Sequence, residues 1–462
     1  MDNTTINSSI FISMLFGLQF FYWLIARRAS NSLKGKEDYF LAEKTVQFFP
    51  LMMTFLATQV GGGIILGAAD EAYQFGWPVL LYPLGAALGL ILLGCGIGRK
   101  LAKFPISTVA QIFEVAYGSA LLRKIASLLS VISLFMILVA QIIASNKFLI
   151  SLGFNHVFLF ILFWLIVIVY TAQGGLRAVI STDIVQASFF SGVFLLCFGF
   201  ILFFEPSISS IQMPQLENFA NVSSKTCGWL LMPLLFMIIE QDMGQRCFAG
   251  ASPKIVSKAS FWAGICTLFI CIVPVFLGSL AKAAGFEIPE GGSVLITTIA
   301  KTTNPWITAL VGCAVLAAIV STATSLINAI SSNLSNDFNL SFLQKVNPMQ
   351  TIKAMTCLIS IGAIFCAFYF DNIVDVLIQS YELSVSCLFV PVFLALFKKR
   401  NNFISALLAM SLGAIGFLFF RIYPITFPKE IASILLSLFG FTCGEVIAHF
   451  SEQREKQRSV NM

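Results

Sequence analysis

Charged side chains are scarce in this chain of 462 residues: Asp, Glu, Lys and Arg make up 11% of it, whereas hydrophobic residues make up 58%. Soluble globular domains carry about 25% charged residues. The shortage of charge excludes an ordinary soluble domain and indicates a protein that crosses a membrane many times. The net charge of +6 comes from basic residues scattered at the ends of apolar runs, so we expect no nucleic-acid partner.

Histidine is also nearly absent, since only His156 and His449 occur and both lie near the ends of apolar runs. Two such residues provide neither a catalytic nor a metal-binding cluster. The 11 cysteines lie mostly inside apolar runs without metal-type spacing, so we interpret them as small packing residues. The sequence therefore predicts neither an enzyme nor a resident metal centre.

Long apolar runs, in contrast, are abundant. A helix needs about 20 apolar residues to cross the hydrocarbon core of a bilayer. Thirteen runs of roughly that length lie near residues 8–26, 46–68, 76–98, 121–152, 156–172, 182–204, 227–246, 258–281, 303–335, 352–370, 374–397, 403–421 and 430–449. We expect an all-α polytopic membrane protein, with one transmembrane domain over residues 1–450 and a short cytoplasmic tail over residues 451–462.

The basic residues predict how these spans are oriented. If the N-terminus lies outside, 22 of the 28 Lys and Arg residues fall in cytoplasmic segments. Cytoplasmic loops carry such an excess of Lys and Arg. We therefore expect a multi-pass protein of the plasma (cytoplasmic) membrane, with the N-terminus outside and the C-terminus in the cytoplasm.

Two features of the spans recur five helices apart. The fourth and ninth spans are the longest, and the second and seventh are interrupted by glycine, proline or polar residues. Repeat units of five helices would lie in the membrane with opposite orientations, as in many secondary transporters. We expect inverted repeats over about residues 46–204 and 227–397, with one extra helix before them and two after. Coincidence among the spans is the alternative.

The second span contains three consecutive glycines, Gly61–Gly63, in the stretch FLATQVGGGIILG. Each glycine costs a helix about 1 kcal/mol relative to alanine, and backbone freed in a membrane must line a cavity or bind something. Because helical N–H groups bond the carbonyl four residues earlier, unwinding here frees the carbonyls of Ala57 and Val60. Two such oxygens suit a hard cation. Close helix packing at the glycines is the alternative.

The ninth span adds hydroxyl groups at helical spacing. Ser321 and Thr322 follow Ala318 by three and four residues, which places their hydroxyls beside its carbonyl. With Ala57 and Val60 they give five neutral oxygens, a set that suits Na⁺ better than a divalent ion, which usually recruits carboxylates. Interhelical packing is the alternative.

Three carboxylates lie in or beside apolar spans and are functional candidates because charge is costly there. Glu240 follows Pro233 in the interrupted seventh span, and Glu382 lies about two turns into the eleventh. Asp183 begins the sixth span, where it can cap the helix or receive a departing cation. The alternative for Glu240 is a place at the cytoplasmic surface.

Four stretches, EDYFLAEKTV, GGLRAVISTDIVQ, QRCFAGASPK and STATSLINAISSNLSNDF, occur in an order that resembles the sodium:solute symporter family, whose members have the LeuT-type fold. The resemblance implies a Na⁺ site at Ala57, Val60, Ala318, Ser321 and Thr322. It further implies a second Na⁺ or a release path at Asp183, Thr324 and Ser325. The substrate-lining candidates are Gln59, Gly61, Gly62, Gly63, Gln141, Glu240 and Glu382.

The motifs ATQVGGG, GQR and LFVPVFLALF look most similar to the choline-transporter branch of that family. That branch surrounds a quaternary ammonium with aromatic rings, whereas Gln59, Ala144 and Glu240 stand at the matching positions here. We therefore expect a Na⁺-coupled symporter that imports a zwitterionic or cationic solute, such as proline, betaine or choline, by alternating access.

Other functions stay open. A proton-coupled carrier, a Na⁺ symporter for a carboxylate, pantothenate or a sugar, and a transporter-like sensor are the alternatives. The expected partners are Na⁺ as the coupling ion, a small solute and the lipid bilayer, and the sequence leaves the oligomeric state open.

Overall fold

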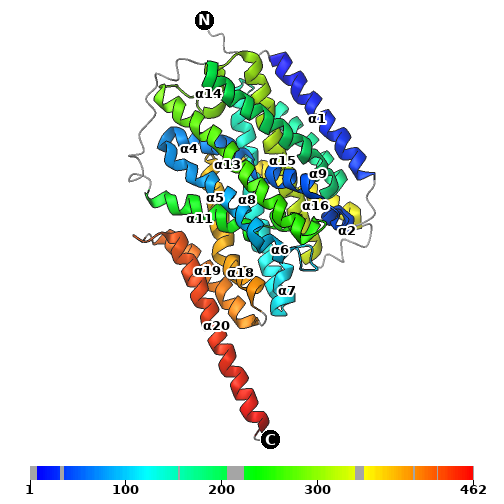
Figure 1. Cartoon of the computed structure of the whole chain (residues 1–462), viewed down its shortest axis with the longest axis vertical. Coiled ribbons are helices and arrows are strands. Elements are labelled where there is room, and N and C mark those ends of the chain that lie inside the picture. The colour runs from blue at the N-terminus through cyan, green and yellow to red at the C-terminus, as the bar shows by residue number, and fades with distance from the viewer. Residues whose placement is uncertain are drawn as a thin grey trace.

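The computed structural model describes residues 8–31, 36–154, 157–204, 223–338, 348–398, 401–423 and 425–460. Apart from one isolated bridge between Val46 and Gly250, the regular elements of these residues are all helices. The helices pack side by side in one elongated bundle, from which α20 (Lys429–Val460) projects at the end that carries the C-terminus (Figure 1). The expected all-α membrane protein is confirmed at this level.

The longer helices follow the predicted apolar runs. Their bounds are α1 Ser8–Ser30, α3 Phe48–Gln59, α4 Ala68–Phe75, α5 Leu81–Leu92, α8 Ala120–Ser151, α9 Val157–Phe204, α11 Ser223–Ile239, α12 Gln241–Ala249, α13 Pro253–Ala283, α15 Pro305–Asp337, α16 Pro348–Ala367, α17 Ile373–Ser384, α18 Val390–Phe397, α19 Phe403–Ile422 and α20. The other α-helices of the described residues are α2 Lys36–Leu41, α6 Gly98–Leu101, α7 Gln111–Tyr117 and α14 Val294–Thr302.

Nine helical segments within the described residues are long and apolar enough to cross a membrane, or ten if the bent pair formed by α3 and the segment Gly63–Phe75 counts as one span. The predicted runs 156–172 and 182–204 both lie within α9, which consists of two helices that meet at a kink, where Gly175 adopts the non-helical angles φ 55° and ψ −155°. A Cβ at Gly175 would lie within 2.4 Å of the Tyr39 carbonyl oxygen, so this kink requires glycine.

The core of the bundle surrounds α15, of which 94% of the most apolar stretch is buried, compared with 22% for α16 and 33% for α19. Lipid-facing helices expose their apolar side chains, whereas a helix buried on all sides must satisfy its polar groups inside the protein. The hydroxyl-rich segment of α15 therefore lies where those hydroxyls face other helices. The tail predicted over residues 451–462 continues α20 as far as Val460, and residues 461–462 and His156 lie outside the described residues.

Both spans that the sequence marks as interrupted are broken. The first bends by 52° between α3 and a π-helix, η2 (Gly63–Gly67). The second breaks between α11 and α12, where Glu240 has the extended backbone angles φ −66° and ψ 131°. These two breaks, together with α8 and α15, position the candidate site.

Candidate functional site

The break after α3 leaves backbone groups that a neighbouring side chain satisfies. The Gly61 N–H donates to the Gln59 carbonyl at 3.1 Å, a tight turn that ends the helix. The next amide, that of Gly62, donates to Oε1 of Gln141 on α8 at 2.7 Å. Because a buried amide without a partner costs free energy, Gln141 stabilises the broken conformation directly.

Each of the three glycines is approached closely by a different helix. A Cβ at Gly61 would lie 2.4 Å from Oγ1 of Thr322 on α15, and one at Gly62 would lie 2.4 Å from Cβ of Ala144 on α8. A Cβ at Gly63 would lie 2.3 Å from Cδ1 of Leu377 on α17. The glycines therefore permit close packing and the break together, so the two interpretations of this run are compatible.

Hydroxyl groups of α15 meet the carbonyls that precede the break. Oγ of Ser321 lies within hydrogen-bond distance of two carbonyl oxygens, that of Ala57 at 2.8 Å and that of Ala318 at 2.9 Å, either of which can accept its single proton. Oγ1 of Thr322 lies 3.2 Å from the Ala57 carbonyl oxygen and 2.9 Å from that of Thr58. Four of the five predicted oxygens thus adjoin one another. The Thr322 hydroxyl bonds the Thr58 carbonyl, and not that of Val60.

This oxygen cluster has the chemistry of a monovalent cation site. Its groups are neutral and buried: Ala57 and Ser321 have no exposed surface. A hydroxyl oxygen that donates to a carbonyl keeps lone pairs with which it can coordinate an ion, as the carbonyl oxygen does. Hard cations take such oxygen ligands, and the shortage of carboxylates disfavours a divalent ion.

A buried arginine that the sequence analysis did not select lies beside this cluster. Arg246, on α12, donates from Nη2 to Oγ of Ser325 at 2.6 Å and from Nε to Oγ1 of Thr54 at 3.0 Å. Its Nη2 also lies 3.4 Å from Oδ2 of Asp183, which accepts from Thr54 at 2.5 Å. In the sequence, the polar GQR triplet that ends the interrupted seventh span is the signal that marks this position.

The residues predicted for a second ion or a release path are partly assembled. Asp183 and Ser325 share Arg246 as a partner, whereas the hydroxyl of Thr324 donates to the Ser321 carbonyl at 3.0 Å. The capping interpretation of Asp183 is wrong, because this residue lies inside α9 and its carboxylate contacts Thr54 and Arg246.

A small cavity of about 20 Å³ lies at the two breaks. Its lining includes five of the predicted substrate-lining residues, Gln59, Gly61, Gly63, Gln141 and Glu240, and also Thr322 of the predicted Na⁺ site. Gly62 faces Ala144 and does not belong to this lining. The lining also contains four polar residues that the sequence does not mark, Thr58, Tyr82, Asp242 and Tyr381.

Glu240 lies at the break between α11 and α12 and is only 5% exposed, which excludes the cytoplasmic-surface interpretation. Its Oε2 has no hydrogen-bond partner among the described residues. The ring of Tyr381, which also lines the cavity, packs against Phe236 at a centroid distance of 4.6 Å. Glu382, predicted as the counterpart of Glu240, lies elsewhere: it lines a separate cavity.

Comparisons with known proteins agree on one family. A sequence model described as the sodium:solute symporter family matches residues 39–413. The high-affinity choline transporter 1 of Drosophila melanogaster is 25% identical over 71% of this chain and 56% of its own length. The sodium/glucose cotransporter of Vibrio parahaemolyticus is 23% identical over 91% of this chain and 85% of its own.

The fold has a solved counterpart. A structure of a Na⁺-coupled sialic acid symporter, in a substrate-bound outward-open state, superimposes with a TM-score of 0.74 at 19% identity. The superposition covers 95% of this chain and 98% of that one. At this identity the likeness establishes the fold and not the substrate.

Proposed function

This chain belongs to the sodium:solute symporter family, and we propose that it imports a small zwitterionic or cationic solute by coupling its entry to Na⁺. It is a multi-pass membrane transporter and not an enzyme. The observation that carries the proposal is the contact of the Ser321 and Thr322 hydroxyls with the carbonyls that end α3.

In this proposal Na⁺ binds the oxygens of Ala57, Val60, Ala318, Ser321 and Thr322. The Thr58 carbonyl supports the site through its bond to the Thr322 hydroxyl, at 2.9 Å. Because a broken helix supplies part of the ligands and α15 the rest, any movement of α15 relative to the break alters the affinity for Na⁺. A site shared between moving parts is what coupling requires.

The composition of the central cavity supports a positively charged substrate group. Glu240 and Asp242 contribute carboxyl groups, and Tyr82 and Tyr381 contribute aromatic rings. Carboxylates and ring faces both attract an ammonium group. Among the described residues no Lys or Arg lines the cavity, so its lining favours amino acids, betaines or amines over carboxylates such as acetate or pantothenate.

Alternating access requires this cavity to change size. At about 20 Å³ it has room for little more than a water molecule, which is too small for the proposed solutes. Solute entry must separate the helices that meet here. The membrane potential then contributes about 2.3 kcal/mol per charge per 100 mV to drive Na⁺ and a cationic solute inward.

We assign Asp183 and Ser325 to the release path of Na⁺, with Thr324 at its border. The guanidinium of Arg246 already supplies positive charge between these two side chains. A second bound Na⁺ would have to displace it or lie against it, which like-charge repulsion disfavours. We therefore propose one coupling ion per cycle.

The proposed topology has thirteen spans, with inverted repeats over residues 46–204 and 227–397 and the N-terminus outside. The two helix breaks and the long helices α8 and α15 occupy corresponding places in these units. Single cysteines introduced at Glu287 and Lys254 should react with a membrane-impermeant maleimide on opposite sides of the membrane. Labelling of both from the same side would contradict the topology.

The direct test is uptake by proteoliposomes under an inward Na⁺ gradient. A panel of L-proline, glycine betaine, choline, glucose, acetate and pantothenate separates the substrate classes. We expect Na⁺-dependent accumulation of a zwitterion or cation. Accumulation of only anions, or of glucose alone, would refute the proposed substrate class, and accumulation that is indifferent to Na⁺ would refute the coupling.

One observation favours a second candidate, a proton-coupled carrier. The neighbouring carboxyl groups of Glu240 and Asp242 both face the central cavity, where they could hold an exchangeable proton. This alternative predicts uptake that survives removal of Na⁺ and falls as the external pH rises. The sensor alternative predicts that no member of the panel accumulates at all.

A further inference from the structure

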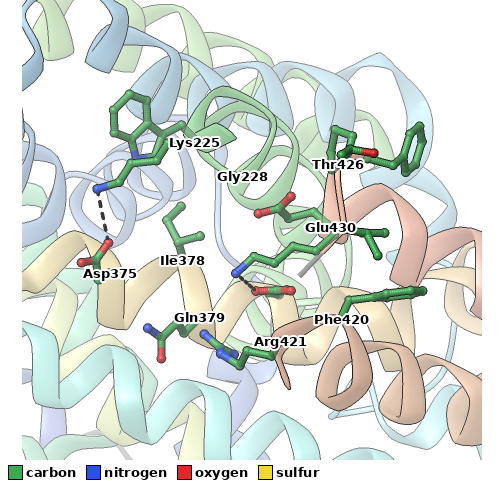
Figure 2. A pocket seen from close by; sticks show the side chains of 15 residues that line it. Lys225, Gly228, Asp375, Ile378, Gln379, Phe420, Arg421, Thr426 and Glu430 are labelled. Atoms are coloured by element: carbon green, nitrogen blue, oxygen red, sulfur yellow. Dashed lines mark ion pairs between the residues drawn. The ribbon is translucent and has the colours of Figure 1, made fainter. Parts of the chain in front are cut away.

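A second and larger cavity lies apart from the proposed transport site. Its volume is about 540 Å³, and its walls come from α11, α17, the end of α19 and the start of α20 (Figure 2). In the proposed topology this is the outer end of the molecule. Cavities of about 300–1,000 Å³ are typical of small-molecule sites.

Helix α17 separates the two cavities. Leu377 and Tyr381 line the central cavity, whereas Ile378 and Glu382 line the outer one. Residues four apart share a helix face and adjacent residues do not, so the two pairs occupy different faces of α17. A ligand in the outer cavity therefore does not need to enter the transport site.

Glu382 presents a buried carboxylate to the outer cavity. The residue is 1% exposed, and neither carboxylate oxygen has a hydrogen-bond partner among the described residues. Its ion-pair partner, Nζ of Lys429, lies 3.6 Å away, beyond hydrogen-bond distance. Burial of a carboxylate without hydrogen bonds is costly, which points to a donor that the protein itself does not supply.

Glu430 adds a second carboxylate to the same cavity. It is 3% exposed, and its Oε2 has no hydrogen-bond partner among the described residues. A Cβ at Gly228 of α11 would lie 3.0 Å from the Glu430 Oε1, so glycine there leaves room for the carboxyl group. Two buried carboxyl groups thus face one space.

The basic side chains of the cavity differ in whether a carboxylate pairs with them. Nζ of Lys225 lies 3.7 Å from a carboxylate oxygen of Glu71 and 3.9 Å from one of Asp375. The Arg421 guanidinium lies over the Phe417 ring at 4.9 Å and lines the cavity (Figure 2). Among the described residues no carboxylate forms an ion pair with Arg421, which leaves its donors for an anionic group.

We propose that this outer cavity binds a small zwitterion with N–H donors on its ammonium group, separately from the transport site and without Na⁺. On binding, the carboxyl groups of Glu382 and Glu430, whose unpartnered oxygens are almost fully covered in this structure, turn toward the ligand and accept from its ammonium N–H groups. The solute carboxylate pairs with the guanidinium of Arg421, whose planar donors suit it. A quaternary ammonium has no N–H group and leaves those oxygens unsatisfied.

The test is calorimetric titration of the purified full-length protein in lipid nanodiscs, in a Na⁺-free potassium buffer. Glycine, L-proline and γ-aminobutyrate are the zwitterionic probes, and tetramethylammonium and acetate are the comparators. We expect at least one zwitterion to bind roughly tenfold or more tightly than either comparator. Absence of zwitterion binding, or equal binding of tetramethylammonium, would overturn the proposal.

Variants distinguish the two cavities. We expect Glu382→Gln to weaken the affinity for that zwitterion by roughly tenfold or more, and the exposed Glu287→Gln to leave it unchanged. If Glu240→Gln abolishes binding and Glu382→Gln does not, the zwitterion occupies the transport site and the outer site is refuted.

A variant at the less buried Arg421 guards against misfolding of Glu382→Gln. Arg421→Gln should weaken zwitterion binding roughly tenfold while binding of methylammonium, which has no carboxylate, stays the same. Equal losses for both probes, or a loss for neither, would contradict the assigned orientation. Size-exclusion profiles and unfolding midpoints measured on each variant establish that the compared proteins are folded.

Discussion

The guanidinium of Arg246 lies 3.4 Å from the carboxylate of Asp183, and both side chains are completely buried. Arg246 belongs to α12 and lies nearly two turns past the break at Glu240, and Asp183 belongs to the middle of α9. A charge pair taken out of water loses its hydration, so this one depends on its additional bonds to Thr54 and Ser325. The ion pair between Arg246 and Asp183 connects the second helix break to the border of the oxygen cluster.

We expect Arg246→Gln to destabilise the protein strongly. Removal of one partner of a buried ion pair costs about 3–5 kcal/mol because the other charge is left without compensation. Asp183→Asn should have a comparable effect. The double variant Arg246→Gln with Asp183→Asn should recover a large part of the loss, because it leaves neither charge. The measurement is the thermal unfolding midpoint of each purified variant.

A partly exposed ion pair provides the control for this double-mutant cycle. Nζ of Lys398 pairs with Glu445 at 2.5 Å, with about a third of each side chain exposed. Lys398→Gln should cost only about 0–1 kcal/mol, because water screens such a pair. If the two Arg246 and Asp183 substitutions instead add their effects, the pair does not act as a unit and the assignment fails.

The second prediction concerns the hydroxyls of the proposed Na⁺ site. Ser321→Ala combined with Thr322→Val removes two oxygens while it keeps nearly the same side-chain volume. We expect the Na⁺ concentration for half-maximal uptake to rise roughly tenfold or more, since each lost contact to a charged ligand costs about 1.5–3 kcal/mol. Uptake at graded Na⁺ concentrations, normalised to the protein present, measures this shift.

Ser331→Ala is the matched control on the same helix. The Ser331 hydroxyl bonds the Ile327 carbonyl at 2.8 Å and lies 2.8 Å from the Thr356 hydroxyl, away from the helix break. It should leave the Na⁺ dependence unchanged. An unaltered Na⁺ dependence in the Ser321 and Thr322 variant would remove the central claim about this site.

Much of the oxygen cluster could be predicted because it follows from local helix geometry. The spacing of backbone hydrogen bonds predicts that a break at Gly61 frees the Ala57 carbonyl, and the position of Ser321 predicts its bond to Ala318. Each of these two predictions requires only the geometry of the helix that contains the residue. The bond from the Thr322 hydroxyl to the Thr58 carbonyl joins α15 to α3. No pattern within one helix encodes how two helices meet.

The remaining site residues depend on which helix faces meet. Tyr82 and Tyr381 reach the central cavity because α5 and α17 turn those faces toward the breaks, whereas Glu382 is on another face and reaches the outer cavity. Sequence alone places Tyr381 and Glu382 side by side in an apolar helix. It therefore could not assign one of them to the transport site and the other away from it.

The third prediction concerns Gly61. A Cβ at this position would lie 2.4 Å from the Thr322 Oγ1 and 2.8 Å from the Gln141 Oε1, so Gly61→Ala must displace both side chains. We expect uptake to fall by roughly tenfold or more, because small displacements of binding groups cost that much. In Gly192→Ala, on the same bundle, an added Cβ meets nothing within 4 Å, and uptake should stay the same. Equal uptake in both variants would show that the close approach at Gly61 is dispensable.

The fourth prediction uses Glu240 to separate Na⁺ coupling from proton coupling. If Glu240 holds the positive group of the solute, Glu240→Gln raises the KM by roughly tenfold or more and leaves the Na⁺ dependence intact. If Glu240 is instead the proton site, the variant loses the pH dependence of uptake and retains exchange of solute across the membrane. Initial rates over a range of solute concentration, pH and Na⁺ distinguish these results.

The exposed Glu287→Gln is the control for Glu240→Gln, because it removes a carboxylate that lines neither cavity. It should change neither the KM nor the pH profile. Retention of the wild-type KM by Glu240→Gln would place the positive group of the solute elsewhere in the cavity. Asp242 would then be the remaining carboxylate able to bind that group there, and Asp242→Asn should produce the rise in KM instead.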